Sequence, residues 1–104
     1  MNDITMYKEE VVRIARAAYD RGLVPGSSGN LSMRLPGKDL VLIKASGVSF
    51  RDMSIEDVIV VDLEGNIVEG DKKPSKEIRF HLGIYRVRPD VGAVLHTHLS
   101  LIHI

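Results

Sequence analysis

Cysteine is absent from the 104-residue sequence, and so is any excess of one charge. Without cysteine the chain has no disulfides and no cysteine-ligated zinc, and this composition fits a reducing compartment. Fourteen Lys and Arg residues balance fourteen Asp and Glu residues. A nucleic-acid surface normally needs a basic excess on one face, and an anionic membrane attracts polybasic segments. We therefore expect neither nucleic acid nor a membrane as a partner.

Long apolar runs are also missing. No apolar stretch approaches the roughly 20 residues that span a bilayer. Residues 1–10 are acidic and polar, and lack the basic start and apolar run of a secretory signal. We therefore expect a cytoplasmic protein. Its length fits one small domain, and 44% hydrophobic with 27% charged residues is an ordinary globular composition.

The first third of the chain predicts an amphipathic helix followed by a loop. Apolar residues recur at helical spacing over residues 4–21, and charged residues take the outer face. The predicted inner face holds Tyr7, Val11, Ile14, Ala15 and Ala18, and the outer face holds Lys8, Glu9, Glu10 and Arg13. Gly22 follows the last turn, where a left-handed residue usually ends a helix. Six of the eight residues in 23–30 are Pro, Gly, Ser or Asn, which is typical of a loop.

The rest of the chain predicts strands and a second helix. Residues 31–35 and 40–44, separated by a turn, indicate a β-hairpin. Residues 54–57 resemble a capped helical turn, and strands are expected over 58–62 and 67–69. Ser75 is expected to cap a helix that runs to about Val87, and residues 91–97 are expected to form a strand. This order of elements predicts a layered α/β fold.

Two histidines stand at the end of the last predicted strand. His96 and His98 are two residues apart, so their side chains point to the same face, about 7 Å apart at their base. Zinc accepts imidazole nitrogen, and catalytic zinc sites commonly use three protein ligands with one open position. The spacing therefore permits a metal site. A pair of partly exposed polar residues at a strand end is the alternative interpretation.

Glu77 and His81 also have more than one interpretation. An acid in the first turn complements the helix dipole, which is worth about 0.3–1 kcal/mol, and for Glu77 taken alone this structural interpretation is favoured. A carboxylate that can reach a metal can also act as a general base. His81 lies one turn later on the same face. Taken alone, His81 is interpreted as a packed or hydrogen-bonded structural residue.

Three segments are suited to binding an anion. The loop Gly26–Asn30 offers backbone N–H groups, hydroxyls and an amide, because glycines let the backbone approach a ligand. Residues 74–76 would add the N–H donors of a helix start, a hydroxyl and a cation. Ser46 and Gly47 form a third candidate segment. Each has a simpler explanation as a turn, or as a helix cap in the case of Ser75.

Taken together, these motifs resemble the class II aldolase/epimerase family. The ordered set is Gly-Ser-Ser-Gly-Asn-Leu-Ser (26–32), Ala-Ser-Gly (45–47), Lys-Pro-Ser-Lys-Glu (73–77), Arg-Phe-His (79–81), Ile-Tyr (84–85), Arg-Pro-Asp-Val (88–91) and His-Thr-His (96–98). The similarity covers nearly all of residues 7–98. The family includes fuculose-phosphate aldolase, ribulose-phosphate 4-epimerase and the non-enzymatic adducin head domain.

The resemblance implies a fold, a cofactor and a site. The fold would be a three-layer α/β/α sandwich around a mixed, mainly antiparallel sheet, in a homotetramer with active sites between subunits. Glu77 would be the acid/base residue and, in some members, also a ligand of the resting metal. His96 and His98 would be two of three histidine ligands of one zinc ion per subunit, although another divalent metal is possible. The substrate-phosphate contacts would be Gly29, Asn30, Ser46, Gly47, Ser75 and Lys76.

The chemistry that the resemblance implies is zinc-dependent cleavage of a ketose phosphate. Zinc would act as a Lewis acid that stabilises an enediolate, Glu77 would move the proton, and the phosphate loops would position the substrate. Epimerisation, dehydration and decarboxylation can use the same constellation, and an adducin-like binding domain is the non-enzymatic alternative. Lys76 departs from the aldolases, which have a second serine there, so a different subclass or a carboxylated substrate is also open.

The end of the chain departs from the family. A third metal histidine would normally lie several dozen residues after His98, and the surroundings of His103 do not match that position. Residues 99–104 match one reading frame of a transposase adapter used to prepare sequencing libraries. We therefore expect residues 1–98 to be the N-terminal part of a single domain and residues 99–104 to be a non-native tail. With its sheet edge unpaired, the 104-residue polypeptide is expected to be aggregation-prone and inactive.

Overall fold

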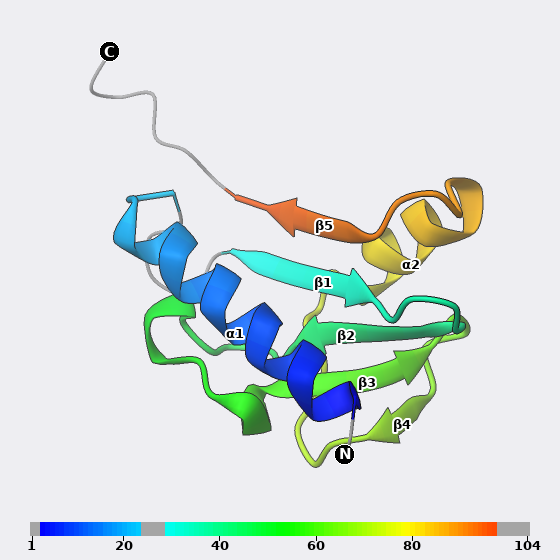
Figure 1. The fold of residues 1–104 in the computed structure, drawn as a ribbon, viewed down its shortest axis with the longest axis horizontal. Coiled ribbons are helices and arrows are strands. Elements are labelled where there is room, and N and C mark those ends of the chain that lie inside the picture. The colour runs from blue at the N-terminus through cyan, green and yellow to red at the C-terminus, as the bar shows by residue number, and fades with distance from the viewer. Residues whose placement is uncertain (1–2, 24–28, 98–104) are drawn as a thin grey trace.

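One antiparallel sheet separates two helices in this chain (Figure 1). The structure is a computed structural model that describes residues 3–23 and 29–97. Its five strands lie in the order β4-β3-β2-β1-β5. The elements are α1 (Asp3–Asp20), β1 (Asn30–Arg34), β2 (Leu40–Lys44), η1 (Phe50–Asp52), η2 (Ile55–Asp57), β3 (Val58–Asp62), β4 (Ile67–Glu69), α2 (Ile78–Val87) and β5 (Ala93–His96).

Strands β2 and β3 are buried on both faces, and this divides the core in two. Successive side chains of a strand point to opposite faces of the sheet. One face of β2 and β3 carries Val41, Ile43, Ile59 and Val61, which pack with Leu82 and Tyr85 of α2. The other face carries Leu42, Val58 and Val60, which pack with Val11, Ala15 and Ala18 of α1. The predicted three-layer α/β/α sandwich around an antiparallel sheet is therefore confirmed.

Helix α1 follows its sequence pattern except at one position. The predicted inner residues Val11, Ala15 and Ala18 are buried, and Gly22 ends the helical segment with φ +75°. Lys8 was expected on the exposed face. Its side chain is instead only 13% exposed, because Nζ lies 2.6 Å from the Glu69 carboxylate. The return strand β4 therefore lies close enough to α1 to cover this lysine.

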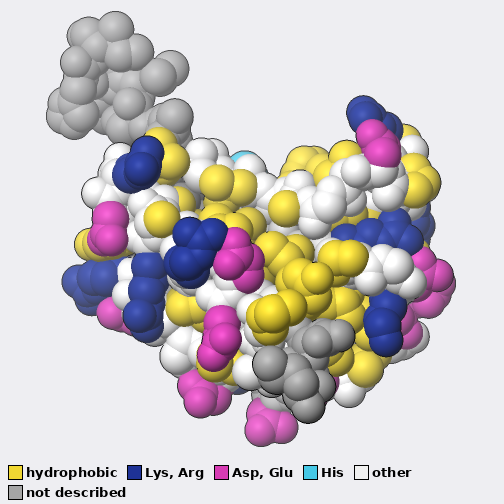
Figure 2. Space-filling model, in the orientation of Figure 1, with side chains coloured by type: hydrophobic (Ala, Val, Ile, Leu, Met, Phe, Trp, Pro, Cys, Tyr) yellow, Lys and Arg dark blue, Asp and Glu magenta, His cyan; other side chains and the backbone are white. Residues whose placement is uncertain are grey.

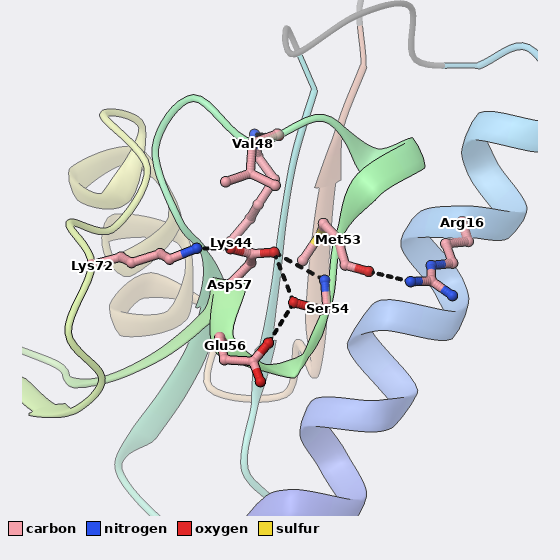
Figure 3. A network of polar contacts seen from close by, with 8 residues as sticks. All are labelled: Arg16, Lys44, Val48, Met53, Ser54, Glu56, Asp57 and Lys72. Atoms are coloured by element: carbon pink, nitrogen blue, oxygen red, sulfur yellow. Dashed lines mark hydrogen bonds and ion pairs between the residues drawn. The ribbon is translucent and has the colours of Figure 1, made fainter.

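The short turn between β2 and β3 is capped as the sequence predicts. The Ser54 backbone N–H and hydroxyl both donate to the Asp57 carboxylate, at 3.0 and 3.2 Å. Lys72 forms an ion pair with the same carboxylate, and Glu56 accepts a second contact from the Ser54 hydroxyl (Figure 3). This network fixes the chain at the start of β3, where the Asp57 carbonyl accepts a hydrogen bond from the Ala45 N–H.

The second helix begins later than the sequence predicts. Ser75 was expected to cap it, but α2 begins at Ile78 and Glu77 occupies the N-cap position. The reason is a long-range contact, because Pro74 forms a β-bridge with Ala45 and the Ser75 N–H donates to the Lys44 carbonyl at 2.8 Å. Residues 74–75 are thereby held against the end of β2. The Ser75 hydroxyl still accepts the Glu77 N–H at 3.2 Å.

Strand β5 is shorter than expected and lies at the edge of the sheet. The predicted strand over 91–97 is reduced to Ala93–His96, because the Val91 N–H closes a turn on the Arg88 carbonyl. Strand β5 pairs antiparallel with β1 and places His96 opposite Asn30. This pairing brings the end of the described chain back to the beginning of the first strand.

The surface that carries α1 mixes acidic, basic and apolar side chains (Figure 2). This distribution is consistent with the balanced charge of the sequence. Within residues 3–23 and 29–97, no helix combines the length and apolarity needed to cross a membrane.

Candidate functional site

Three chain segments meet at one pocket. Its volume is about 260 Å³, and it lies where β1 begins, where β2 ends and where the chain approaches α2. All six residues predicted to bind substrate and the predicted acid/base residue line it. The lining is Gly29, Asn30, Lys44, Ser46, Gly47, Ser75, Lys76 and Glu77. Residues that are up to 48 positions apart in sequence therefore line one pocket.

Backbone hydrogen bonds hold the second and third segments side by side. The Ser46 N–H donates to the Lys73 carbonyl, and the Ser75 N–H donates to the Lys44 carbonyl, both at 2.8 Å. Gly47 has φ +79°, a conformation that residues with a Cβ rarely adopt, so the turn after Ser46 favours glycine. The pocket wall is consequently built from fixed backbone rather than from side chains alone.

Lys44 lines the pocket although the sequence interpretation treated it only as the end of a strand. It is 2% exposed, its Nζ donates to the Val48 carbonyl at 2.6 Å, and it lies 5.7 Å from the centre of the Phe50 ring. Burial lowers the pKa of Lys44, and the nearby Asp57 carboxylate opposes that effect. A lysine that closes an otherwise apolar strand is the sequence signal that could have identified it.

Glu77 and His96 face each other beside the pocket. The Glu77 Oε1 lies 3.9 Å from the His96 Nδ1, and each side chain is partly exposed. Strand β5 positions the imidazole, and the N-cap of α2 positions the carboxylate. The Phe80 ring lies 6.0 Å from the His96 ring and covers one side of it. Two of the three predicted metal-binding residues are therefore neighbours.

Asn30 connects the pocket with the histidine. It is 4% exposed and lines the pocket, while its Nδ2 lies 3.4 Å from the His96 Nδ1. Its Oδ1 accepts a hydrogen bond from the His81 Nε2. The side chain thus has neighbours on two sides, one in the predicted metal site and one in the core.

His81 is buried in a polar cluster. Its Nδ1 lies 2.6 Å from the Ser32 hydroxyl, which lies 2.8 Å from the Tyr85 hydroxyl. Burial lowers the pKa of His81 to about 4, the nearby His96 adds to this effect, and Glu77 opposes it. The interpretation of His81 as a hydrogen-bonded structural residue is confirmed. Its partner Ser32, and Tyr85 that contacts Ser32, were not identified as site residues from sequence.

The residues present suit a divalent metal in donor chemistry. An imidazole and a carboxylate lie side by side at His96 and Glu77, and zinc accepts both donor types at about 2.0–2.2 Å. His98 and most of the Gly26–Asn30 loop fall outside the described residues, as does the tail at 99–104. Within the described ranges no group of three metal-binding side chains is assembled. The predicted set of ligands therefore stays a prediction.

Comparison with known families identifies the class of protein that this fold and pocket define. The class II aldolase and adducin N-terminal domain matches residues 9–101, which is most of the chain. The chain therefore belongs to the class II aldolase/adducin family.

Two curated bacterial relatives show the range of activities within this family. The chain is 38% identical over 91 residues to 5-deoxy-D-ribulose 1-phosphate aldolase of Bacillus thuringiensis, covering 88% of this chain and 43% of the relative. It is 43% identical over 98 residues to 3-oxo-tetronate 4-phosphate decarboxylase of Haemophilus influenzae, covering 94% of this chain and 45% of the relative. The chain thus spans less than half the length of these relatives.

A solved structure has the same fold. An L-fuculose 1-phosphate aldolase superposes with a TM-score of 0.85 and 34% sequence identity, over 96% of this chain and 46% of that chain. The arrangement of helices and strands described above is therefore the arrangement found in an aldolase of this family.

Proposed function

We propose that the protein is a metal-dependent aldolase that cleaves a phosphorylated ketose. The observation that carries this proposal is the single pocket at which the three predicted anion-binding segments meet beside Glu77 and His96. Backbone N–H groups, hydroxyls and two lysines suit a phosphate. A carboxylate next to an imidazole suits proton transfer and metal binding.

Each group has a defined task in this proposal. Residues Gly29, Asn30, Ser46, Gly47, Ser75 and Lys76 hold the phosphate and so orient the carbon–carbon bond that breaks. Glu77 holds the proton that is exchanged at the carbon next to the carbonyl. His96, His98 and in the resting state Glu77 would hold one zinc ion per subunit. When bound, the metal supplies Lewis-acid stabilisation of negative charge on the substrate oxygens.

The remaining assignments also belong to the proposal. We infer a homotetramer, with sites completed between subunits, and a cytoplasmic location that suits a chain without cysteine. Both follow from the family resemblance and the composition.

The test uses the protein that the complete gene encodes. Purified protein should release dihydroxyacetone phosphate or another small phosphorylated ketone from a ketose phosphate, lose this activity with a chelator, and regain it with zinc. Glu77→Gln should reduce kcat by about 10²–10⁴-fold, the usual contribution of a positioned acid/base. Glu64→Gln, which changes an exposed carboxylate elsewhere, should leave kcat unchanged. Absence of bound zinc together with no turnover of any sugar phosphate would favour the adducin-like binding role instead.

Decarboxylation is a second candidate because of two observations. Lys76 lines the pocket where the aldolases have a serine, and the chain is 43% identical to a 3-oxo-tetronate 4-phosphate decarboxylase. A lysine cation suits a substrate that carries a carboxylate as well as a phosphate. Release of carbon dioxide from a phosphorylated 3-oxo sugar acid, without cleavage of ketose phosphates, would select this candidate.

A further inference from the structure

A chain of polar side chains runs through the core from α2 to the pocket. The Tyr85 hydroxyl contacts the Ser32 hydroxyl at 2.8 Å, and the Ser32 hydroxyl contacts the His81 Nδ1 at 2.6 Å. The His81 Nε2 then contacts the Asn30 Oδ1, and the Asn30 Nδ2 reaches the His96 Nδ1 at 3.4 Å. Ser32, His81 and Tyr85 are fully buried, so bulk water does not compete for the contacts among these three residues.

The direction of the hydrogen bonds can be worked out from the Tyr85 end. Within the described residues the Tyr85 hydroxyl has the Ser32 hydroxyl as its hydrogen-bond partner, so its proton has the Ser32 oxygen as acceptor. The opposite direction would leave this proton without an acceptor in the described part of the chain, which is costly for a buried hydroxyl. Ser32 must therefore donate its single proton to the His81 Nδ1.

The same logic orients the amide of Asn30. A neutral imidazole has one donor and one acceptor nitrogen, so a His81 that accepts at Nδ1 donates at Nε2. An Nδ1 that accepts from Ser32 carries no proton, so His81 is neutral. Its Nε2–H requires the carbonyl oxygen of the Asn30 amide as partner, and the amide nitrogen then faces His96.

We propose that Tyr85, Ser32 and His81 form a positioning relay that holds the Asn30 amide with its N–H donors toward the site. A flipped amide would turn its carbonyl oxygen toward the site, where it would repel an anionic substrate. The relay residues are positioning residues, because they act through Asn30. This inference rests on the proposed function, since it assumes that an anion binds where Asn30 lines the pocket.

The direct test is the tautomer of His81 in the protein that the complete gene encodes. Nitrogen-15 NMR of labelled histidine should show the Nε2–H tautomer of His81 in the wild-type protein. Tyr85→Phe removes the proton donor to Ser32, so His81 should populate both tautomers. Tyr7→Phe, which removes a hydroxyl at the opposite face of the sheet, should leave the tautomer unchanged. A wild-type His81 protonated at Nδ1 would overturn the relay, whatever the activity of the enzyme.

Binding of inorganic phosphate provides the functional measurement. Tyr85→Phe should weaken phosphate binding and raise KM by about three- to tenfold, the effect of one misoriented hydrogen bond, with kcat changed less than about twofold. His81→Gln keeps a donor for Asn30 and should stay within about twofold of wild type, whereas His81→Leu should lose affinity. Equal losses in His81→Gln and His81→Leu would show packing alone and overturn the relay. A wild-type protein with the expected tautomer and phosphate affinity but no lyase or decarboxylase activity would refute the proposed function and support the relay.

Discussion

The buried imidazole of His81 makes stability depend on pH. Burial, with a smaller contribution from His96 and against the effect of Glu77, lowers its pKa to about 4 from an ordinary value near 6.5. Below pH 6.5 the unfolded chain binds a proton at this residue that the folded chain does not bind until about pH 4. The contribution of His81 to the free energy of unfolding should therefore be fully present above pH 6.5. It should decrease as pH falls toward 4.

The expected loss from this one residue is on the order of 3 kcal/mol by pH 4. Urea unfolding at a series of pH values measures it. His81→Gln has no imidazole to protonate, so its free energy of unfolding should change much less between pH 6.5 and 4. A decrease of the same size in the variant would show that other groups cause the pH dependence.

Lys44 provides a second prediction at the residue scale. Its buried ammonium lines the pocket, so Lys44→Met should weaken binding of inorganic phosphate about tenfold by removing a cation that is little screened by water. Lys38→Met changes an exposed lysine in the turn between β1 and β2 and serves as the matched control. Calorimetric titration of both variants compares them. Equal phosphate affinities of the two variants would show that Lys44 does not contact the phosphate and serves only as hydrogen-bond donor to the Val48 carbonyl.

Sequence reasoning identified most of the residues that line the pocket, but it missed buried residues behind them. Ser46, Ser75 and Glu77 were found because they stand in recognisable motifs. Ser32 and Tyr85 were missed because the contacts of Ser32 with His81 and with Tyr85 join a strand and a helix that are about 50 residues apart. A single sequence contains no local signal for such a contact.

At the scale of elements, a predicted helix or strand boundary is accurate where residues close in sequence determine it. Strands β2, β3 and β4 were predicted with the observed bounds, because turn residues enclose each apolar run. Helix α2 was predicted to begin too early, since a serine after a proline is a good local cap signal. The bridge between Pro74 and Ala45 overrides that signal through a contact made 29 residues away.

The turn before β3 should be held mainly by Asp57. Its side chain is 6% exposed and accepts from the Ser54 N–H, the Ser54 hydroxyl and Lys72. Asp57→Ala should lower the free energy of unfolding by about 1–3 kcal/mol, because these donors lose their acceptor. Glu56→Ala, one residue away and exposed, should cost less than about 0.5 kcal/mol. Denaturant unfolding measures the free energy of unfolding of both variants. Equal decreases in Asp57→Ala and Glu56→Ala would show that the Asp57 carboxylate is not the main source of stability in this turn.

At the scale of the whole molecule, the edge beside the site is exposed. Strand β5 pairs with β1, and Leu95 of β5 is 43% exposed, as is Phe80 of α2 at 54%. An exposed apolar edge strand is a template for pairing with another chain. The 104-residue polypeptide should therefore self-associate, and light scattering at increasing concentration measures this. Leu95→Lys should reduce the association, whereas Lys38→Met, away from the edge, should not. A monodisperse wild-type monomer at high concentration would contradict this expectation.

The order of strands in the sheet has a consequence for how the pocket assembles. Strands β1, β2 and β3 each pair with the next strand along the chain, so β1 to β4 form a meander. Strand β5 instead returns to β1, and Asn30 pairs with His96 across 66 positions. Closing a longer loop costs more conformational entropy, and contacts that are distant in sequence slow folding. The meander should therefore form early, with β5 docking late. The His96 imidazole, the Asn30 amide and the Glu77 carboxylate meet only at that last step. The geometry of the proposed site is therefore a late product of folding and would be among the first features lost when the edge of the sheet opens.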